Sequence, residues 1–449
     1  MSIVDAAWLQ MDRPTNPMVV NVLLSYERSV DPHAVRTILE ERIAARFPRF
    51  RQRVGRDLLG RPRWEDDGPF DVDRHLHRLA LPAPGDREAL QQLIGDLVSV
   101  PLDRGKPLWD LYMIDGYGHG CALLVRVHHC VGDGVALSQA LGPLVGVDSQ
   151  DAFALPAPGA NGRGALGRLP LAGLASSGWH GAEGFLRAGA ATALHPARLP
   201  GAAAQRSADM EALARLLAGR TDAHGPLKRE PGMGQRVAWS RPLPLADLKR
   251  SARDADATVN DLLVTAVSGA LGRYLRARGA GIDELHAVMP INLRPLDRPL
   301  PRELGNRFGL LIVALPVGIR GQRKRLAAVK QTLNALKRSR QAPVSFAILG
   351  ALGLTPAQLE APAVDFFTAK ATLVLTNVVG PPTPLQTAGT ELAGVLVWAP
   401  CSGNLGISVT MLSYSGQVSI GLLTDGGLVP HPDRLVDRIE TELHQLTAG

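Results

Sequence analysis

The sequence predicts a two-domain α/β protein, and three observations support this fold class. The chain has 449 residues, which is enough for two domains of typical size. Apolar residues make up 45% of it and can fill a sizeable core. Helix and strand patterns alternate within residues 1–150 and again within 231–449, whereas residues 151–230 are rich in Ala, Gly and Pro. We therefore expect an N-terminal domain, a crossover linker and a C-terminal domain over these ranges.

Hydrophobic spacing predicts the elements of the N-terminal domain. Apolar residues recur at helical intervals in three segments, and two of these follow an aspartate that can cap the first turn. Short apolar runs on either side of a glycine-rich turn predict two strands. The helices are expected at 32–47 (N-cap Asp31), 87–97 (N-cap Asp86) and 135–145, and the strands at 111–113 and 122–129 around the turn 116–120.

The C-terminal domain has two well-marked helices. In 258–275, Thr258 can cap the first turn and the apolar residues share one face. The second helix, 322–340, is amphipathic, and its basic outer face is either solvated or able to lie on anionic lipid. That face is expected to carry Arg323, Lys324, Arg325, Lys330, Lys337, Arg338 and Arg340, and strands are expected at 310–317, 371–375, 406–411 and 417–422.

Charge and composition restrict the partners and the location. The net charge of +7 suits an anionic partner, but nucleic acid is disfavoured because the basic residues are not interleaved with aromatic ones. Three cysteines suit a reducing compartment. The chain shows no signal peptide and no run of the ~20 apolar residues that span a bilayer. We expect a cytoplasmic protein, with peripheral attachment to the inner membrane face or to lipid inclusions left open, including through Trp179 and Phe185 of the linker.

The segment His128-His129-Cys130-Val131-Gly132-Asp133-Gly134 is the strongest candidate for a reactive site, because it combines histidines with a carboxylate in a glycine turn. A neutral imidazole can accept a proton near pH 7, since its ordinary pKa is ~6.5. Gly134 would let backbone or ligand approach closely. Two structural histidines without chemistry are the plain alternative. A metal site is disfavoured because the chain has no spacing typical of zinc ligands.

Strand geometry separates the two histidines. If the strand continues through both, His129 shares a face with Val127 and Val125, whereas His128 shares the other face with Arg126. His129 is therefore the better candidate for a general base, and His128 is expected to be a supporting residue.

The pattern His-His-x-x-x-Asp-Gly resembles the active-site motif of the CoA-dependent acyltransferase superfamily. Further blocks, in order along the chain, resemble the bacterial wax ester synthase/diacylglycerol acyltransferase family. They are 4–8 (Val-Asp-Ala-Ala-Trp) with 16–18, Pro107-Leu108-Trp109, the segment 258–261 (Thr-Val-Asn-Asp), 290–294 (Pro-Ile-Asn-Leu-Arg, with Asn where Ser is usual), Gly305-Asn306, Leu315-Pro316 and 376–381 (with Val379 in place of a proline).

This resemblance implies a fold of two chloramphenicol-acetyltransferase-like domains with the active site in a tunnel between them. Acyl-CoA would be the co-substrate, with no bound cofactor, and the acceptor would be diacylglycerol or a long-chain alcohol. The resemblance also implies that Asp133 pairs with an arginine and is structural. Arg294 matches that position, and Arg126 is a local competitor.

Ester formation needs a base for the attacking hydroxyl and a donor for the oxyanion. His129 is the expected base, and Asn260 is a candidate donor. Arg294, Trp109 and Asn377 are further candidates for substrate binding, with packing as the alternative for Trp109 and Asn377. The chain has no Gly-x-Ser-x-Gly elbow, so direct transfer is favoured over a serine acyl-enzyme. Cys130 is disfavoured as a nucleophile. Acylation of another hydroxyl, as in a polyketide or glycolipid, and an idle lipid-surface protein are the rival functions.

Overall fold

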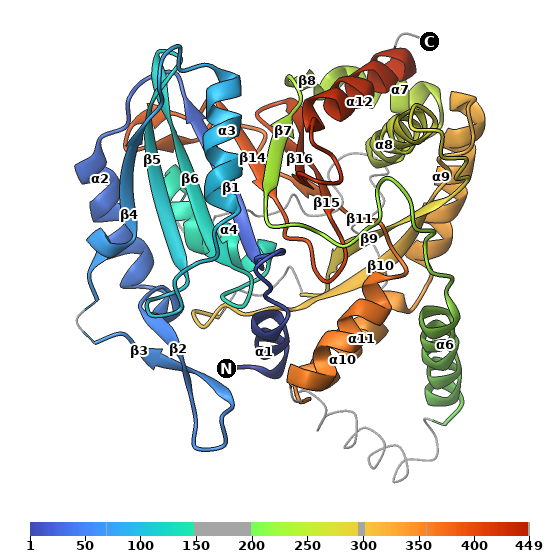
Figure 1. Ribbon diagram of the computed structural model, residues 1–449, viewed down its shortest axis with the longest axis horizontal. Helices are drawn as coiled ribbons and strands as arrows, with labels where there is room; N and C mark the ends of the chain where they lie inside the picture. The colour runs from blue at the N-terminus through green and yellow to red at the C-terminus, as the bar shows by residue number, and fades with distance from the viewer. Residues whose placement is uncertain (69, 148–198, 295–300, 356, 448–449) are drawn as a thin grey trace.

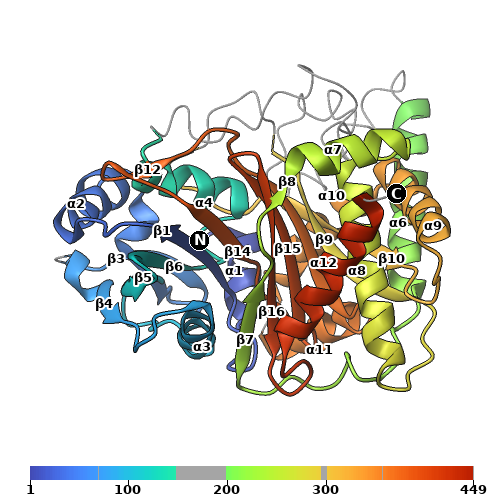
Figure 2. The same ribbon diagram turned by 90° about the horizontal axis from the view of Figure 1, so that it is seen from above.

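Two lobes make up the protein, each built around one β-sheet (Figures 1 and 2). The computed structural model describes residues 1–68, 70–147, 199–294, 301–355 and 357–447. The linker residues Trp179 and Phe185, for which membrane contact was left open beside packing on the protein, lie outside the described residues.

The first sheet has five strands in the order β14-β1-β6-β5-β4. Cross-strand pairing is antiparallel except between β4 and β5. The two strands predicted around the glycine turn are its centre, and both extend further than the apolar runs indicated. The bounds are β1 Val19–Tyr26, β4 Leu76–Ala80, β5 Trp109–Tyr117, β6 Gly120–His128 and β14 Gly394–Trp398.

Alternation along β6 divides the side chains between two cores. Leu123, Val125 and Val127 pack into one core, and Ala122 and Leu124 into another. Three predicted helices cover the sheet, and the first of them continues as a π-helix. These are α2 Pro32–Thr37 with Ile38–Ala44, α3 Arg87–Val98 and α4 Gly134–Leu141; the β2–β3 hairpin (Gln52–Arg56, Pro62–Asp66) projects from this lobe, as Figure 1 shows.

One strand departs from the expected division into contiguous domains. β14 lies in the C-terminal range 231–449, yet it pairs with β1 along the edge of the first sheet, Asn21 opposite Trp398 and Ser25 opposite Gly394. In Figure 2 it reaches across from the second lobe into the first. The reason is that β1 would otherwise leave an edge of backbone N–H and C=O groups without partners.

The second sheet runs β10-β9-β11-β15-β16-β7, with β8 also paired to β16. The pairs β9–β11 and β11–β15 are parallel, and the rest are antiparallel. The strand bounds are β7 Gln235–Trp239, β8 Leu243–Pro244, β9 Leu285–Asn292, β10 Phe308–Leu315, β11 Leu373–Val379, β15 Ile407–Tyr414 and β16 Gln417–Asp425; a separate pair is β12 Gln386–Thr387 with β13 Thr390–Glu391.

Helix α8 (Val259–Arg276) is the central helix of the second lobe. Thr258 accepts from the backbone N–H of Asp261, and the Asp261 carboxylate accepts from that of Thr258, so the predicted N-terminus is closed by a capping box. Because α8 packs against α12, α9 and strand β10 of the sheet, it is buried on nearly every side. The other helices are α1 Ile3–Gln10, α6 Leu199–Ala218, α7 Leu245–Asp254, α9 Gln322–Lys337, α10 Gln341–Leu352, α11 Ala357–Thr368 and α12 Pro432–Thr447.

The predicted basic helix 322–340 needs two corrections. It ends at Lys337, so Arg338 and Arg340 lie beyond α9, with Arg340 directly before α10. Arg325 was expected at the surface, but its side chain is 1% exposed and pairs with Glu442 at 2.5 Å. It lies four and eight residues before Val329 and Leu333, so it falls on the same inward stripe. Within the described residues, no helix combines the length and apolarity needed to cross a membrane.

Candidate functional site

His128 ends β6 and is fixed by the turn that follows it. Its Nδ1 accepts a hydrogen bond from the Cys130 backbone N–H at 3.1 Å, so in the neutral ring the proton is on Nε2. That Nε2 lies 3.7 Å from the Asp12 carboxylate. Burial raises the pKa of Asp12, but His128 and Arg104 outweigh it and lower the pKa to about 2. His128 Nδ1 is thus occupied within the N-terminal half, whereas Nε2 is buried beside Asp12 without a hydrogen-bond partner among the described residues.

His129 lies just beyond the strand, so the alternation that the sequence suggested does not extend to it. It nevertheless lies on the apolar side, because its ring stacks on Trp8 at 4.5 Å between centroids and contacts Phe308 at 5.3 Å. Trp8 comes from α1 and Phe308 from β10, so the two halves of the chain meet on this imidazole. The residue is 9% exposed.

Asn306 determines which nitrogen of His129 carries the proton. The Asn306 amide nitrogen donates to Asp5 Oδ1 and to the His129 carbonyl, both at 2.8 Å, and neither oxygen can donate in return. The amide oxygen must therefore face His129 Nδ1, which lies 3.0 Å away and donates to it. The neutral ring then has its lone pair on Nε2, and no described residue hydrogen-bonds to that atom.

Asp5 anchors this arrangement from the first helix. Its carboxylate is fully buried, accepts from the backbone and side chain of Asn306, and pairs with Arg49 at 2.9 Å. Arg49 also donates to the carbonyls of Cys130 and Val131, at 3.1 and 2.9 Å. The turn that carries the histidines is therefore held by a continuous set of hydrogen bonds.

Asp5, Trp8 and Asn306 received no functional role from the sequence. The available signals were the segment 4–8 and the pair Gly305-Asn306, both of which stood out only as blocks resembling a family. The contact between these residues forms only in the tertiary structure, because Asp5 and Asn306 are 301 residues apart in the sequence.

The electrostatics around His129 favour a neutral ring. Burial lowers the pKa of His129 below 6.5, and the hydrogen bond to Asn306 and the charge of Asp133 offset this only in part. A neutral imidazole with its lone pair on Nε2 can accept a proton at pH 7.

Asp133 joins the two halves of the chain on the far side of the turn. It caps α4 through the Ala136 N–H and accepts the Arg307 backbone N–H at 2.7 Å. Of the two arginines weighed as its partner, Arg294 makes the pair, at 2.9 Å, whereas Arg126 donates to Asn21 and the Val100 carbonyl. Arg294 also donates to the Gly305 carbonyl, so its guanidinium is committed inside the protein.

Close backbone approach in the turn occurs at Gly132 rather than at Gly134. Gly132 forms a bridge to Gly305, and a Cβ there would lie 3.0 Å from the Ala136 Cβ. A Cβ on Gly134 would meet no atom within 4 Å. No contact with a described residue therefore requires glycine at 134, and its expected role toward a ligand stays a prediction.

Asn260 and Asn377 meet each other and not His129. The Asn377 amide nitrogen donates to Asn260 Oδ1 at 2.9 Å, joining the first turn of α8 to β11. The Asn260 amide nitrogen is buried and has no hydrogen-bond partner among the described residues. A buried N–H without an acceptor is uncommon in a folded protein and is available to an oxygen that enters the site.

Two other sequence candidates are packed within the first lobe. The Trp109 indole is 1% exposed, donates to the Phe50 carbonyl at 2.8 Å and stacks on His75 at 4.3 Å. These contacts fit the packing alternative, and a substrate contact stays a prediction. Cys130 is fully buried, and burial raises the pKa of its thiol well above 9.0, which keeps it protonated.

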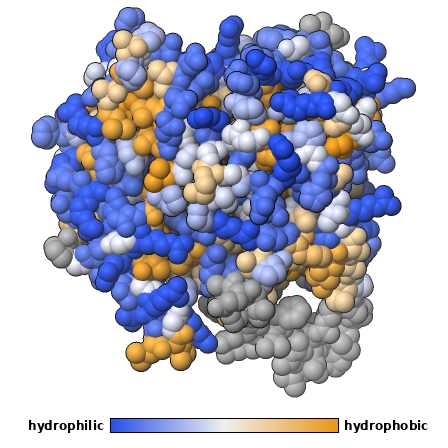
Figure 3. Space-filling view, viewed as in Figure 1, coloured by the Kyte–Doolittle hydropathy of each residue, from blue (hydrophilic) through white to orange (hydrophobic). Residues whose placement is uncertain are grey.

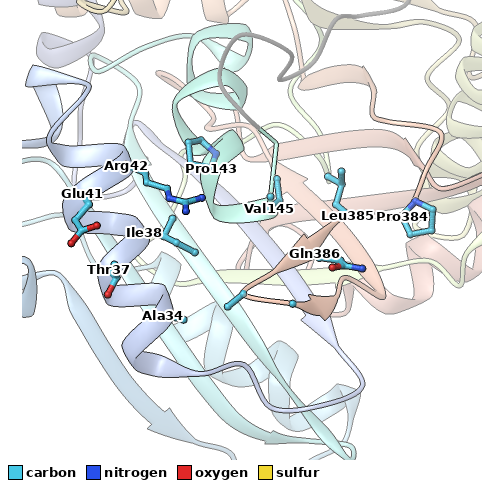
Figure 4. A pocket seen from close by; sticks show the side chains of 13 residues that line it. Ala34, Thr37, Ile38, Glu41, Arg42, Pro143, Val145, Pro384, Leu385 and Gln386 are labelled. Atoms are coloured by element: carbon cyan, nitrogen blue, oxygen red, sulfur yellow. The ribbon is translucent and has the colours of Figure 1, made fainter.

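Two cavities of the structure lie away from His129. One of about 610 Å³ is bordered by Ile38, Arg42, Pro143 and Leu385 (Figure 4), and one of about 440 Å³ lies between α6, α9 and β10. Neither is lined by His129, so the tunnel inferred from the resemblance stays a prediction. In the described ranges, no three His, Cys, Asp or Glu side chains form a group that could hold a metal ion.

Fold and site together define a chloramphenicol-acetyltransferase-like protein of two domains. A wax ester synthase/diacylglycerol acyltransferase from Marinobacter aquaeolei superposes with a TM-score of 0.68 at 21% identity, over 98% of this chain and 97% of that one. The first condensation domain of the calcium-dependent antibiotic synthetase gives 0.59 at 16% identity, over 99% and 95%. At such identities, the likeness concerns the fold alone.

Sequence comparison identifies the family within this class. The wax ester synthase/diacylglycerol acyltransferase catalytic domain matches residues 1–263, and the C-terminal domain of the same family matches 304–447. A Mycobacterium tuberculosis protein named "Probable diacyglycerol O-acyltransferase tgs1" is 29% identical over 397 residues, covering 87% of this chain and 82% of the relative. The chain therefore belongs to the wax ester synthase/diacylglycerol acyltransferase family, as the sequence blocks predicted.

Proposed function

We propose that the protein transfers a long-chain acyl group from acyl-CoA to the hydroxyl of diacylglycerol or of a long-chain alcohol, with both substrates bound at once. His129 is the general base. The observation that carries this proposal is the Asn306 amide, whose two donated hydrogen bonds leave only its oxygen for His129 Nδ1. The base is thereby fixed with a free lone pair before any substrate enters.

In the proposed reaction, one nitrogen, His129 Nε2, first accepts a proton and later returns it. As the acceptor hydroxyl attacks the thioester carbonyl, His129 Nε2 takes its proton and a tetrahedral oxyanion forms. The C–O bond is then complete, the C–S bond breaks, and the same Nε2 returns the proton to the departing CoA sulfur. The products are an ester and free CoA. A positioned base supplies about 10²–10⁴-fold of the rate.

The oxyanion needs a hydrogen-bond donor, and Asn260 is our candidate. Its buried amide nitrogen has no partner in the described part of the chain, and Asn377 fixes the amide orientation by donating to its oxygen. A donor that is already oriented costs no reorganisation when charge develops. Asp133 and Arg294 have a different part in this proposal, because their ion pair holds the histidine turn against the second lobe.

Lipid substrates agree with the surroundings of the base, since Trp8 and Phe308 place aromatic surface on the imidazole. They also agree with the family and with the mycobacterial relative's name. We further propose a cytoplasmic location with peripheral contact to a membrane or lipid inclusion, where such substrates are found.

Release of CoA tests the proposal directly. The purified full chain would be mixed with palmitoyl-CoA and either dioleoylglycerol or hexadecanol, and free thiol would be followed with time. Release that depends on the acceptor is expected, and thin-layer chromatography with both acceptors in competition would show the preferred ester. If lipids bind but no lipid alcohol promotes release, the protein is an idle lipid-surface protein. Release only with a polyketide or glycolipid hydroxyl would replace the proposed acceptors.

A further inference from the structure

The β2–β3 hairpin presents two leucines directly to solvent. Leu58 and Leu59, at the tip, are 106% and 75% exposed, the highest values among the exposed large apolar residues of the described chain. In Figure 1 the hairpin extends beyond the body of the first lobe, and in Figure 3 its tip is an apolar knob bordered by hydrophilic atoms. Two adjacent large apolar side chains at a projecting tip form a candidate contact surface, because burying them would remove apolar area from water.

The tip has a defined turn that holds these leucines outward. One oxygen of the Asp57 carboxylate accepts the backbone N–H groups of Leu59 and Arg61, at 2.9 and 2.8 Å. The Gly60 N–H donates to the Asp57 carbonyl, and Gly60 has a φ of 74°, a conformation that suits glycine. The backbone N–H of Asp57 is satisfied by the Arg61 carbonyl. The backbone that carries the two leucines is therefore fixed by the turn while their side chains stay exposed.

The exposed charges nearest the tip that lack an opposite partner are positive. Arg56 and Arg61 are exposed and pair with no carboxylate among the described residues. Farther from the tip, Arg53 and Arg63 are exposed but pair with Glu65 at 3.6 and 2.8 Å, and Asp66 accepts from Gln52. A cationic collar around an apolar tip suits a surface that is anionic outside and apolar beneath.

The base of the hairpin is connected to the site of His129. Trp64 pairs with Val54 across the hairpin, and both pack against the first core. The Arg49 guanidinium lies 5.0 Å over the Trp64 ring, and the same guanidinium pairs with Asp5, which holds Asn306. A surface that receives the tip would thus lie on the same side of the lobe as the network that fixes the base.

We propose that the tip of the β2–β3 hairpin inserts into an anionic lipid bilayer, with Leu58 and Leu59 among the acyl chains and Arg56 and Arg61 at the phosphates. Helix α9 has positive charge but no apolar side chains to insert into a bilayer, because none of the exposed large apolar residues in the described chain lies on it. A protein partner is disfavoured by the narrow tip, which offers two leucines rather than a broad apolar face.

Vesicle co-sedimentation of the full chain tests this docking. The probes are vesicles of phosphatidylcholine alone and of phosphatidylcholine with phosphatidylglycerol. Leu58→Ser with Leu59→Ser should lower partitioning to the anionic vesicles at least about tenfold, because two side chains lose their transfer from water. Arg56→Gln with Arg61→Gln should weaken anionic binding alone, and added salt should reduce this difference.

The matched control is Val100→Ser with Met233→Ser, which removes two apolar side chains that are each 58% exposed and lie outside the hairpin. It should bind as the original chain does. Equal vesicle binding by the leucine variant and the original chain would overturn the proposal, as would no binding by the original chain. The proposal would also be overturned if the leucine variant changed only the oligomeric state measured by light scattering. That result would show that the tip contacts another protein chain. Thermal unfolding and CoA release with a water-soluble alcohol should be unchanged in the leucine variant, so loss of docking is distinguishable from failure of the proposed catalysis.

Discussion

The surroundings of His129 and of Asn260 differ in one respect. Around His129, Asn306, Asp5 and Arg49 hydrogen-bond to one another and orient the ring, although the stacked Trp8 indole N–H is buried without a partner in the described chain. Around Asn260, the oxygen accepts from Asn377, but an amide N–H is buried without an acceptor among the described residues. The His129 ring is therefore oriented before substrate arrives, whereas the Asn260 amide N–H still lacks an oxygen. A base must be oriented in advance, and a donor for developing charge is satisfied only when that charge forms.

The largest expected effect comes from removing the base itself. His129→Ala should lower acceptor-dependent CoA release by about 10²–10⁴-fold, because no other described group accepts the hydroxyl proton there. His128→Ala should retain more activity, since both its ring nitrogens already face the protein. Initial rates of thiol release measure both. A larger loss for His128→Ala than for His129→Ala would reverse the assignment.

Asp133→Ala tests the link between the two regions. The Asp133–Arg294 pair is nearly buried, at 5% and 8% side-chain exposure, so removing one partner leaves a charge without compensation. We expect a loss of about 3–5 kcal/mol in the free energy of unfolding. Urea unfolding would measure it, with Asp247→Ala, whose pair with Arg250 is exposed, as the control. A variant of normal stability that has lost turnover would show instead that Asp133 acts in the chemistry.

Asn260→Ala would sharpen the comparison most directly. If its amide nitrogen stabilises the oxyanion, kcat should fall by about 10²–10³-fold with little change in KM. Steady-state kinetics with varied acyl-CoA separate these constants. Asn377→Ala, which removes the partner that orients Asn260, should give a smaller fall in kcat. An unchanged kcat in Asn260→Ala would remove this residue from the site.

Asn306→Ala should reduce kcat by about 10- to 100-fold, because a hydrogen-bond partner that fixes the ring tautomer of a histidine is lost. The Asp5 carboxylate and the His129 carbonyl also lose a donor, so some stability is lost as well. Comparing kcat at equal folded fraction isolates the catalytic part. If activity falls only in step with the folded fraction, Asn306 has a structural role alone.

The smallest expected effect is the pH dependence. Burial lowers the pKa of His129 below 6.5, so the ring should be neutral across about pH 7–8 and kcat/KM constant there. As the pH falls, protonation removes the base, and the acid limb should have a midpoint below 6.5. The contribution of His129 to the free energy of unfolding changes in the same direction as the activity. It is present above the pKa of His129 in the unfolded state and is lost as the pH falls, because the unfolded state binds the proton more readily. Urea unfolding over the same range separates the two, and an acid limb centred above 6.5 would contradict the assignment.

The sequence predicted local structure better than it predicted contacts between distant residues. Thr258 and Asp86 cap the helices that they were expected to cap, because capping depends on neighbours three residues away. The histidine strand was found for a similar reason. The Asp5–Asn306 contact could not be predicted from spacing, because it forms only when two lobes meet. Arg325 was placed on the wrong face because a charged residue on an apolar stripe is ordinarily a surface residue, and its partner Glu442 is distant in sequence.

The pairing of β14 with β1 has a consequence for the order in which the chain is made. During synthesis, residues 1–150 emerge long before Gly394–Trp398 is available, so β1 has a partner only on its β6 side. A nascent sheet with an open edge can pair with the wrong strand or with another copy. The first lobe therefore becomes complete only late in translation, and separate expression of residues 1–150 should yield an aggregation-prone fragment.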